Sequence, residues 1–212
     1  MKKIVGLLYI LVGAACIFLA VFIIRNNLIE NEQAGSASDN FLDGVIAQIP
    51  DTVFAASGDM PVVDVDGHSF IGTVEIPSLG LLLPVQNEWD KQDAKFAICR
   101  YEGSVYENNL IICGHNYDEH FGKLGQLNSG DDVIVTDMNG ISYYFKVSNM
   151  ETLGATDIEE MESGDWDLTL FTCTVGGANR VTIRCEATGE VTEVGAAPDV
   201  LDAAEKSKHI RK

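Results

Sequence analysis

An uncharged apolar run of 21 residues, 4–24, near the amino terminus constrains this chain more than any other feature. At 1.5 Å per residue, a helix of this length matches the roughly 30 Å hydrocarbon core of a bilayer. Lys2 and Lys3 precede the run, Arg25 follows it, and the first acidic residue is Glu30. The positive-inside tendency therefore predicts a single-pass helix with a cytoplasmic amino terminus and an extracellular remainder.

Two alternatives to a retained anchor remain open. A cleaved signal peptide has an apolar core of about 7–15 residues, which is shorter than this run. Lipid attachment at Cys16 is the other alternative, because the small residues Gly13, Ala14 and Ala15 precede that thiol. The apolar run continues well past Cys16, which favours a retained helix.

Composition divides the chain into four parts and excludes one class of partner. We expect an anchor at residues 1–25, an extracytoplasmic tether at 26–69 with one short amphipathic helix near 41–54, a β-domain at 70–187 and a polar tail at 188–212. A disordered spacer is the alternative for the tether. The net charge is -18, with 32 acidic and 14 basic residues. A chain so acidic lacks the cationic surface that binds nucleic-acid phosphates, so we expect no nucleic acid.

Short β-rich runs begin at Phe70 and predict an all-β domain. We expect strands at about 70–76, 81–86, 95–100, 109–114, 132–137, 141–149, 167–173 and 180–186. Asn139 and Gly140 predict a hairpin turn, because this pair supplies positive φ angles. Eight strands with only short helical turns between them favour a closed antiparallel barrel, which leaves no exposed edge, and a two-sheet sandwich has the same signature.

Four cysteines follow the predicted anchor, and one of them differs from the rest. Cys99, Cys113 and Cys185 lie within apolar runs and resemble core residues, although four exported cysteines also allow two disulfides. Cys173 ends a predicted strand and precedes a loop that contains two glycines. A thiol in that position is accessible, and a substrate backbone can approach it closely.

Two further residues complete a candidate catalytic site. Arg180 begins the predicted strand that follows the loop with the two glycines, so a hairpin would place its guanidinium beside Cys173. A guanidinium in that position favours a thiolate and can bind an oxyanion. Arg184 has the same strand parity and is expected to be a surface charge or a pairing residue. His115 leaves a strand through a glycine and is favoured over His120 as the acid/base.

These residues carry a resemblance to the sortase family. Residues 169–173, Thr-Leu-Phe-Thr-Cys, resemble the TLxTC signature, and Arg180 matches the arginine that follows it. Residues 112–116 resemble the segment with the catalytic histidine, and residues 71–77 and 82–85 resemble the opening strands. The resemblance covers about residues 70–187 and implies an eight-stranded β-barrel on the outer face of a Gram-positive cell. His115-Asn116 is similar to class B, whereas the short stretch 151–166 is more similar to class D or A.

The resemblance implies a membrane-anchored cysteine transpeptidase with thiol peptidase chemistry. Cys173 would attack an LPxTG-like sorting signal of a surface protein, His115 would transfer protons and Arg180 would hold the oxyanion. The thioester would then pass to an amine of a cell-wall precursor or of a pilin. We expect no cofactor and no metal, although Asp157, Glu159 and Glu160 lie where family members bind calcium.

Two other hypotheses remain open at the level of sequence. A non-catalytic β-barrel on a membrane tether, with Cys173 buried or in a disulfide, would be a binding module with structural cysteines. A zinc site of Cys113, His115, Cys173 and Cys185 is the other, but its Cys-x-His spacing is atypical of closed structural sites.

Overall fold

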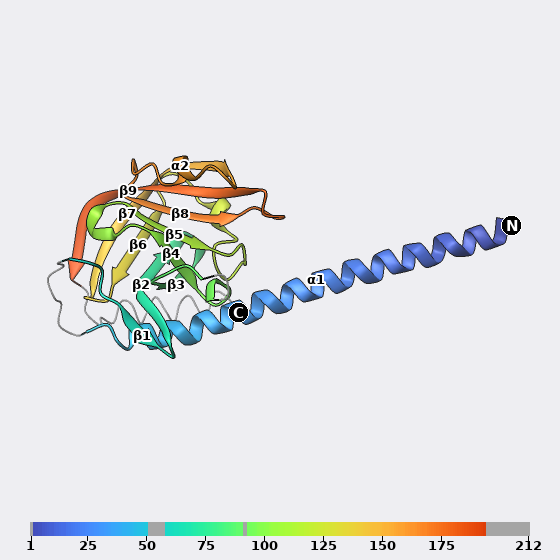
Figure 1. Cartoon of the computed structure of the whole chain (residues 1–212), viewed down its shortest axis with the longest axis horizontal. Helices are drawn as coiled ribbons and strands as arrows, with labels where there is room; N and C mark the ends of the chain where they lie inside the picture. The colour runs from blue at the N-terminus through green and yellow to red at the C-terminus, as the bar shows by residue number, and fades with distance from the viewer. Residues whose placement is uncertain (1, 51–57, 91–92, 194–212) are drawn as a thin grey trace.

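A computed structural model describes residues 2–50, 58–90 and 93–193 of the chain. It consists of a β-rich domain and one long helix that projects far beyond it, with the amino terminus at the distant end (Figure 1). The helix takes up about the first fifth of the chain, and all the strands follow it.

Nine strands form a single sheet, and they include all eight that the sequence predicted. The extra strand is β1, which pairs with the start of β2. The strands are β1 (Val63–Val65), β2 (His68–Ile76), β3 (Leu81–Gln86), β4 (Ile98–Glu102), β5 (Leu110–Gly114), β6 (Asp132–Asp137), β7 (Ile141–Gly154), β8 (Leu168–Cys173) and β9 (Asn179–Glu193). Short 3-10 helices, η1 (Pro77–Leu79), η2 (Asp93–Lys95), η3 (Val105–Glu107) and η4 (Leu124–Gln126), connect several of them.

The order of the strands is β1-β2-β3-β4-β5-β8-β9-β7-β6, and β2 also pairs with β6. The pairings therefore run in a ring through eight strands, with β1 outside it. The prediction of a wholly antiparallel sheet is wrong at two places, because β3 is parallel to β4 and β5 is parallel to β8. Strand propensity does not encode direction, which depends on where the connecting segments cross the domain.

The main core lies on the inward face of this ring. Every strand from β2 to β9 contributes apolar side chains to it, as the alternation of side chains in a strand requires. On β8 the inward residues are Leu168 and Leu170, and on β9 they are Ile183 and Cys185. The residues between them point outward, and this alternation determines which side chains of β8 and β9 are available for chemistry.

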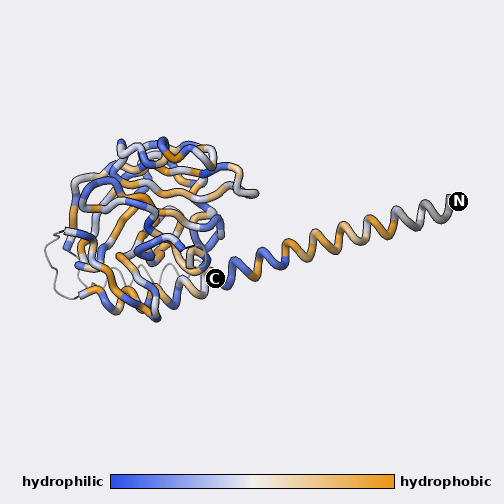
Figure 2. Tube along the Cα trace, viewed as in Figure 1, coloured by the Kyte–Doolittle hydropathy of each residue, from blue (hydrophilic) through white to orange (hydrophobic). Residues whose placement is uncertain are grey.

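Helix α1 (Lys2–Ile46) is continuous through the predicted anchor and well into the predicted tether. Within the described residues, α1 is the one helix that is long and apolar enough to cross a membrane. Its apolar part is exposed and lies away from the β-domain, and its polar part begins as it approaches that domain (Figure 2). The sequence predicted a separate short helix at 41–54. Residues 41–46 are instead the end of α1, residues 47–50 are not helical, and residues 51–54 lie outside the described part.

The end of α1 is anchored on the β-domain by apolar side chains. Leu42 and Val45 are fully buried, and Val45 packs with Val65, Phe70 and Ala97 in a cluster separate from the main core. The helix contacts β1, β2 and β3. The helix is thus fixed to the domain along one side rather than connected to it by a loose spacer.

Three smaller sequence predictions can also be compared with the structure. The predicted hairpin between β6 and β7 is present. Of the pair Asn139 and Gly140, only Gly140 has a positive φ. The Asp137 carboxylate accepts hydrogen bonds from the backbone N–H groups of Asn139 and Ile141. One of the short helical turns expected between the strands is α2 (Ile158–Met161), which lies between β7 and β8. β9 continues to Glu193, past the expected domain end at 187, whereas the rest of the tail, 194–212, lies outside the described residues.

Candidate active site

Cys173 and Arg180 face each other across the hairpin of β8 and β9. Their Cα atoms are register partners, and both side chains lie on the outward face, because Leu170 and Ile183 occupy the inward one. The Cys173 thiol is free and half-buried. The loop between the strands turns through Gly176 and Gly177, both with positive φ, where a side chain would strain the backbone. This local hairpin is the geometry that the sequence predicted.

His115 joins this pair because β5 and β8 are parallel. Gly114 is the register partner of Thr172, and the Thr172 hydroxyl donates to the Gly114 carbonyl oxygen at 2.8 Å. Parallel strands end at the same edge of a sheet, so His115 and Cys173 leave their strands side by side. A Cβ at Gly114 would lie 2.8 Å from Ile98 Cγ2, so the close approach of β4 requires glycine at this position.

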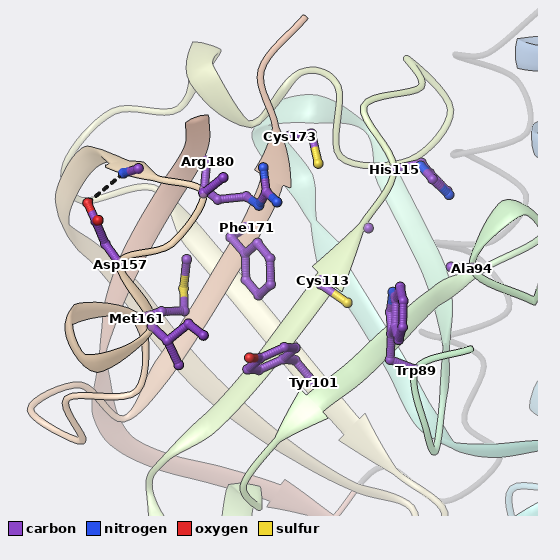
Figure 3. A pocket seen from close by; sticks show the side chains of 14 residues that line it. Trp89, Ala94, Tyr101, Cys113, His115, Asp157, Met161, Phe171, Cys173 and Arg180 are labelled. Atoms are coloured by element: carbon purple, nitrogen blue, oxygen red, sulfur yellow. Dashed lines mark hydrogen bonds between the residues drawn. The ribbon is translucent and has the colours of Figure 1, made fainter. Parts of the chain in front are cut away.

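The three residues line one pocket of about 300 Å³ on the outward face of the sheet. Figure 3 shows Cys173 and His115 along one side, Arg180 reaching in from the start of β9, and Tyr101 and Trp89 on the opposite side. The remaining lining is mostly apolar and comes from η2, β5, β8 and the segment around α2. The pocket combines a thiol, an imidazole and a guanidinium with an apolar floor that can hold an apolar side chain of a ligand.

The environment of His115 keeps its imidazole neutral. The side chain is half-buried, and burial lowers its pKa below the ordinary value of 6.5, with a smaller contribution from the charge of Lys95. Its ring packs against the ring of Tyr117 at a centroid distance of 5.3 Å. At neutral pH such an imidazole can accept a proton, as a general base must.

The loop carbonyls hold Arg180 at the edge of the pocket. Its Nη1 donates to the carbonyl oxygens of Gly177, at 3.0 Å, and Asn179, at 3.1 Å. These bonds fix one nitrogen of a planar group with five N–H donors. A fixed cation opposite Cys173 is an arrangement that can stabilise negative charge developing on a carbonyl oxygen.

The three remaining cysteines after α1 are buried core residues, as predicted, but they lie in two different clusters. Cys185 is in the main core, where burial raises its pKa to about 12, as predicted. Cys99 and Cys113 are buried but lie on the outward face as register partners, in a small cluster with Ala94 and Phe171. Cys113 lines the pocket, and burial raises its pKa well above the usual range. All five cysteines are free thiols.

Arg184 is a pairing residue, and the alternative of a surface charge is wrong. Only 2% of it is exposed, and its Nε donates to Glu151 Oε1 at 2.8 Å. Its Nη1 donates to the Met161 carbonyl and to the Thr169 hydroxyl, and its Nη2 to the Glu160 carbonyl. The guanidinium therefore connects β7, β8 and β9 to α2, which forms one wall of the pocket.

The aromatic lining of the pocket was not predicted from the sequence. Phe171 could have been found by parity, because it lies two residues before Cys173 on the same face of β8. Tyr101 and Trp89 come from other parts of the chain, and Tyr101 packs edge-on against Phe171 at 5.4 Å. His120, the less favoured histidine, is fully buried outside the pocket. In residues 2–50, 58–90 and 93–193, no three His, Cys, Asp or Glu side chains are placed to hold a metal ion, so the zinc hypothesis has no support there.

A family model for the sortase domain matches residues 74–188, more than half of the chain. The chain belongs to the sortase family. Sortases are cysteine transpeptidases, so membership accounts for a strand-end cysteine with a histidine and an arginine beside it. A search of curated proteins found no match.

Solved sortases of several classes share this fold. Sortase C-3 from Streptococcus pneumoniae matches with a TM-score of 0.54 at 20% identity, over 84% of this chain and 92% of that one. Listeria monocytogenes sortase A matches with 0.53 at 17% identity, over 63% and 94%. A Clostridium perfringens sortase D5 transpeptidase matches with 0.51 at 20% identity, over 57% and 79%. At these identities the likeness concerns the fold, a sortase-like β-rich domain preceded here by an apolar helix.

Proposed function

We propose that this sortase is a membrane-anchored transpeptidase that cleaves an LPxTG-like sorting signal and joins the released protein to an amine. The observation that carries the proposal is the convergence of three side chains in one pocket: Cys173 and Arg180 from the hairpin of β8 and β9, and His115 from the end of β5, which is distant in sequence. A binding module with a structural cysteine would have no need of this combination. The acceptor is an amine of a cell-wall precursor or of another surface protein such as a pilin.

The first half of the proposed reaction makes a thioester. The neutral His115 imidazole takes the proton of the Cys173 thiol as the sulfur attacks the carbonyl carbon of the Thr residue in the sorting signal, and the carbonyl oxygen becomes an oxyanion beside Arg180. The C–N bond then breaks, and the leaving amine takes a proton from His115. The apolar floor holds the preceding part of the signal during this step.

The second half returns the enzyme to its starting state. The acceptor amine attacks the thioester carbon and gives its proton to His115, whose lowered pKa favours the neutral imidazole that this step requires. The C–S bond breaks, and His115 returns this proton to the Cys173 sulfur, which restores the thiol and the neutral imidazole. Atoms and protons balance without a cofactor.

We further propose that α1 is a single-pass anchor with a cytoplasmic amino terminus and that the catalytic domain is extracellular, on a Gram-positive cell. The uncharged run, with Lys2 and Lys3 before it and Arg25 as the nearest basic residue after it, supports this orientation. Substrate and acceptor would then be held at the same surface as the enzyme. We also take the ring of strand pairings to be the closed eight-stranded barrel of the family.

Intact-mass analysis tests the proposed chemistry. The full chain in detergent micelles is incubated with a panel of LPxTG-like peptides, and we expect an acyl adduct on Cys173 that disappears when an amine acceptor is added. Cys173→Ala should form no adduct, whereas Cys185→Ala, on the inward face of β9, should form it normally. Thiol labelling that finds Cys173 unreactive would favour the non-catalytic barrel.

A further inference from the structure

The helix that leaves the predicted membrane segment contacts the loop that carries His115. We call residues 26–35 of α1 the juxtamembrane segment and residues 115–122 the His115 loop. Asn31 Oδ1 accepts a hydrogen bond from the backbone N–H of Asp118 at 2.8 Å, across 87 positions of sequence. A direct bond thus joins the anchor helix to the loop with the proposed acid/base.

Close packing reinforces this bond one turn further along the helix. Ala34 and Gly35 are both buried in an otherwise largely exposed stretch of α1. A Cβ built on Gly35 would lie 2.8 Å from Cγ and 3.2 Å from Cβ of Glu119, so any larger residue here would force the Glu119 side chain to shift. The contact therefore has the tight fit of a docked helix rather than of a passing one.

Backbone hydrogen bonds within the His115 loop hold its residues together, so a contact at Asp118 can fix the position of His115. The Tyr117 carbonyl accepts from the N–H groups of His120, at 2.9 Å, and Gly122, at 2.8 Å. The His115 carbonyl accepts from the N–H of Phe121, which is fully buried. The Tyr117 ring packs on the imidazole of His115, and the Asp118 amide bound by Asn31 is the next residue along the chain.

We propose that the juxtamembrane segment positions the imidazole of His115, with Asn31 as the positioning residue. The inference rests on the proposed role of His115 in transpeptidation. The apolar run ends at residue 24, so about 10 Å of continuous helix separates it from Asn31. The part of α1 that leaves the bilayer is then a component of the active site and not only a tether, and a domain released from it would retain Cys173 but hold His115 less accurately.

Substitutions at position 31 test this role in the full chain in detergent micelles. Asn31→Leu keeps the approximate shape but removes the acceptor, and Asn31→Asp keeps an acceptor oxygen. We expect Asn31→Leu to lower kcat about threefold to tenfold with KM nearly unchanged, since an ordinary hydrogen bond accounts for a factor of this size and small misplacements slow catalysis. Asn31→Asp should recover most of that loss.

The matched control is Asn27→Leu, an exposed asparagine one turn earlier on the same helix. It should behave like the wild type. Hydrogen exchange gives a readout independent of activity: amides of residues 115–122 should exchange faster in Asn31→Leu and not in Asn27→Leu. Gly35→Ala offers a second variant, with Gly13→Ala, which has open space around it, as its control.

Equal kcat in Asn31→Leu and Asn27→Leu, or a higher KM at constant kcat, would overturn the inference while leaving the proposed function intact. Unchanged exchange in the His115 loop would overturn it as well, because the contact would then be absent in solution. A wild-type protein that forms no acyl adduct would instead refute the proposed function, and this inference with it.

Discussion

Replacing Arg184 by lysine keeps a positive charge but removes the planar fork that holds four acceptors together. In the structure Nε donates to Glu151, Nη1 to the Met161 carbonyl and the Thr169 hydroxyl, and Nη2 to the Glu160 carbonyl. A single ammonium on a flexible stem reaches about two of these acceptors. The others lose their donor in a place where little water can replace it, because Arg184 is 2% exposed.

The expected cost follows from the number of bonds lost. A hydrogen bond to a charged group contributes about 1.5–3 kcal/mol. We take the low end, since the Glu151 side chain is 34% exposed and water screens this pair in part. Two lost bonds then amount to about 3 kcal/mol. For a domain of this size that corresponds to a fall in Tm of about 6–12 °C.

Thermal unfolding of the full chain in detergent, followed by circular dichroism in the β-sheet region, measures this loss. Lys146→Ala is the control, because Lys146 and Asp132 form an ion pair whose side chains are 49% and 52% exposed, and such pairs are worth about 0–1 kcal/mol. If Arg184→Lys lowers Tm no more than Lys146→Ala does, the buried guanidinium does not hold α2 against the sheet, and our account of this pocket wall is wrong.

Four further predictions concern the site itself. Cys173→Ala should abolish peptide cleavage measured by mass, and any appreciable turnover would refute the mechanism. Arg180→Lys should lower kcat/KM by about 10²–10³ with Tm almost unchanged, whereas Arg100→Lys, whose guanidinium bonds Asn87 outside the pocket, should keep its rate. Burial lowers the pKa of His115, so its contribution to stability is complete above pH 6.5 and is lost as the pH falls below that value. His115→Gln should therefore flatten the dependence of Tm on pH in this range, and an unchanged slope would contradict the buried, neutral state of His115. Iodoacetamide at neutral pH should label Cys173 long before Cys113, whose raised pKa keeps it protonated, and equal rates would show that the pocket is more open than described.

Local sequence was sufficient for the strands and for one pair of the site. All eight predicted strands are present, because alternating β-branched and aromatic residues bounded by Gly, Asn and Asp encode strand and turn over short distances. The pairing of Cys173 with Arg180 is also encoded over a short distance, because the six residues between them include two glycines and form the turn of a hairpin. The positions of Cys185 and Phe171 on opposite faces also follow from strand parity.

What the sequence could not decide are the contacts between segments distant in the chain. The sequence by itself determined the apolar helix, the strand-end cysteine and the family, because each depends on neighbouring residues. Only the tertiary structure made β5 parallel to β8 and so brought His115 to the edge where Cys173 lies; an antiparallel pair would have placed them at opposite ends. It also buried Arg184 beneath α2 and set Asn31 against the His115 loop. These depend on which surfaces meet when the chain closes on its core, and no short-range pattern of residues specifies that meeting.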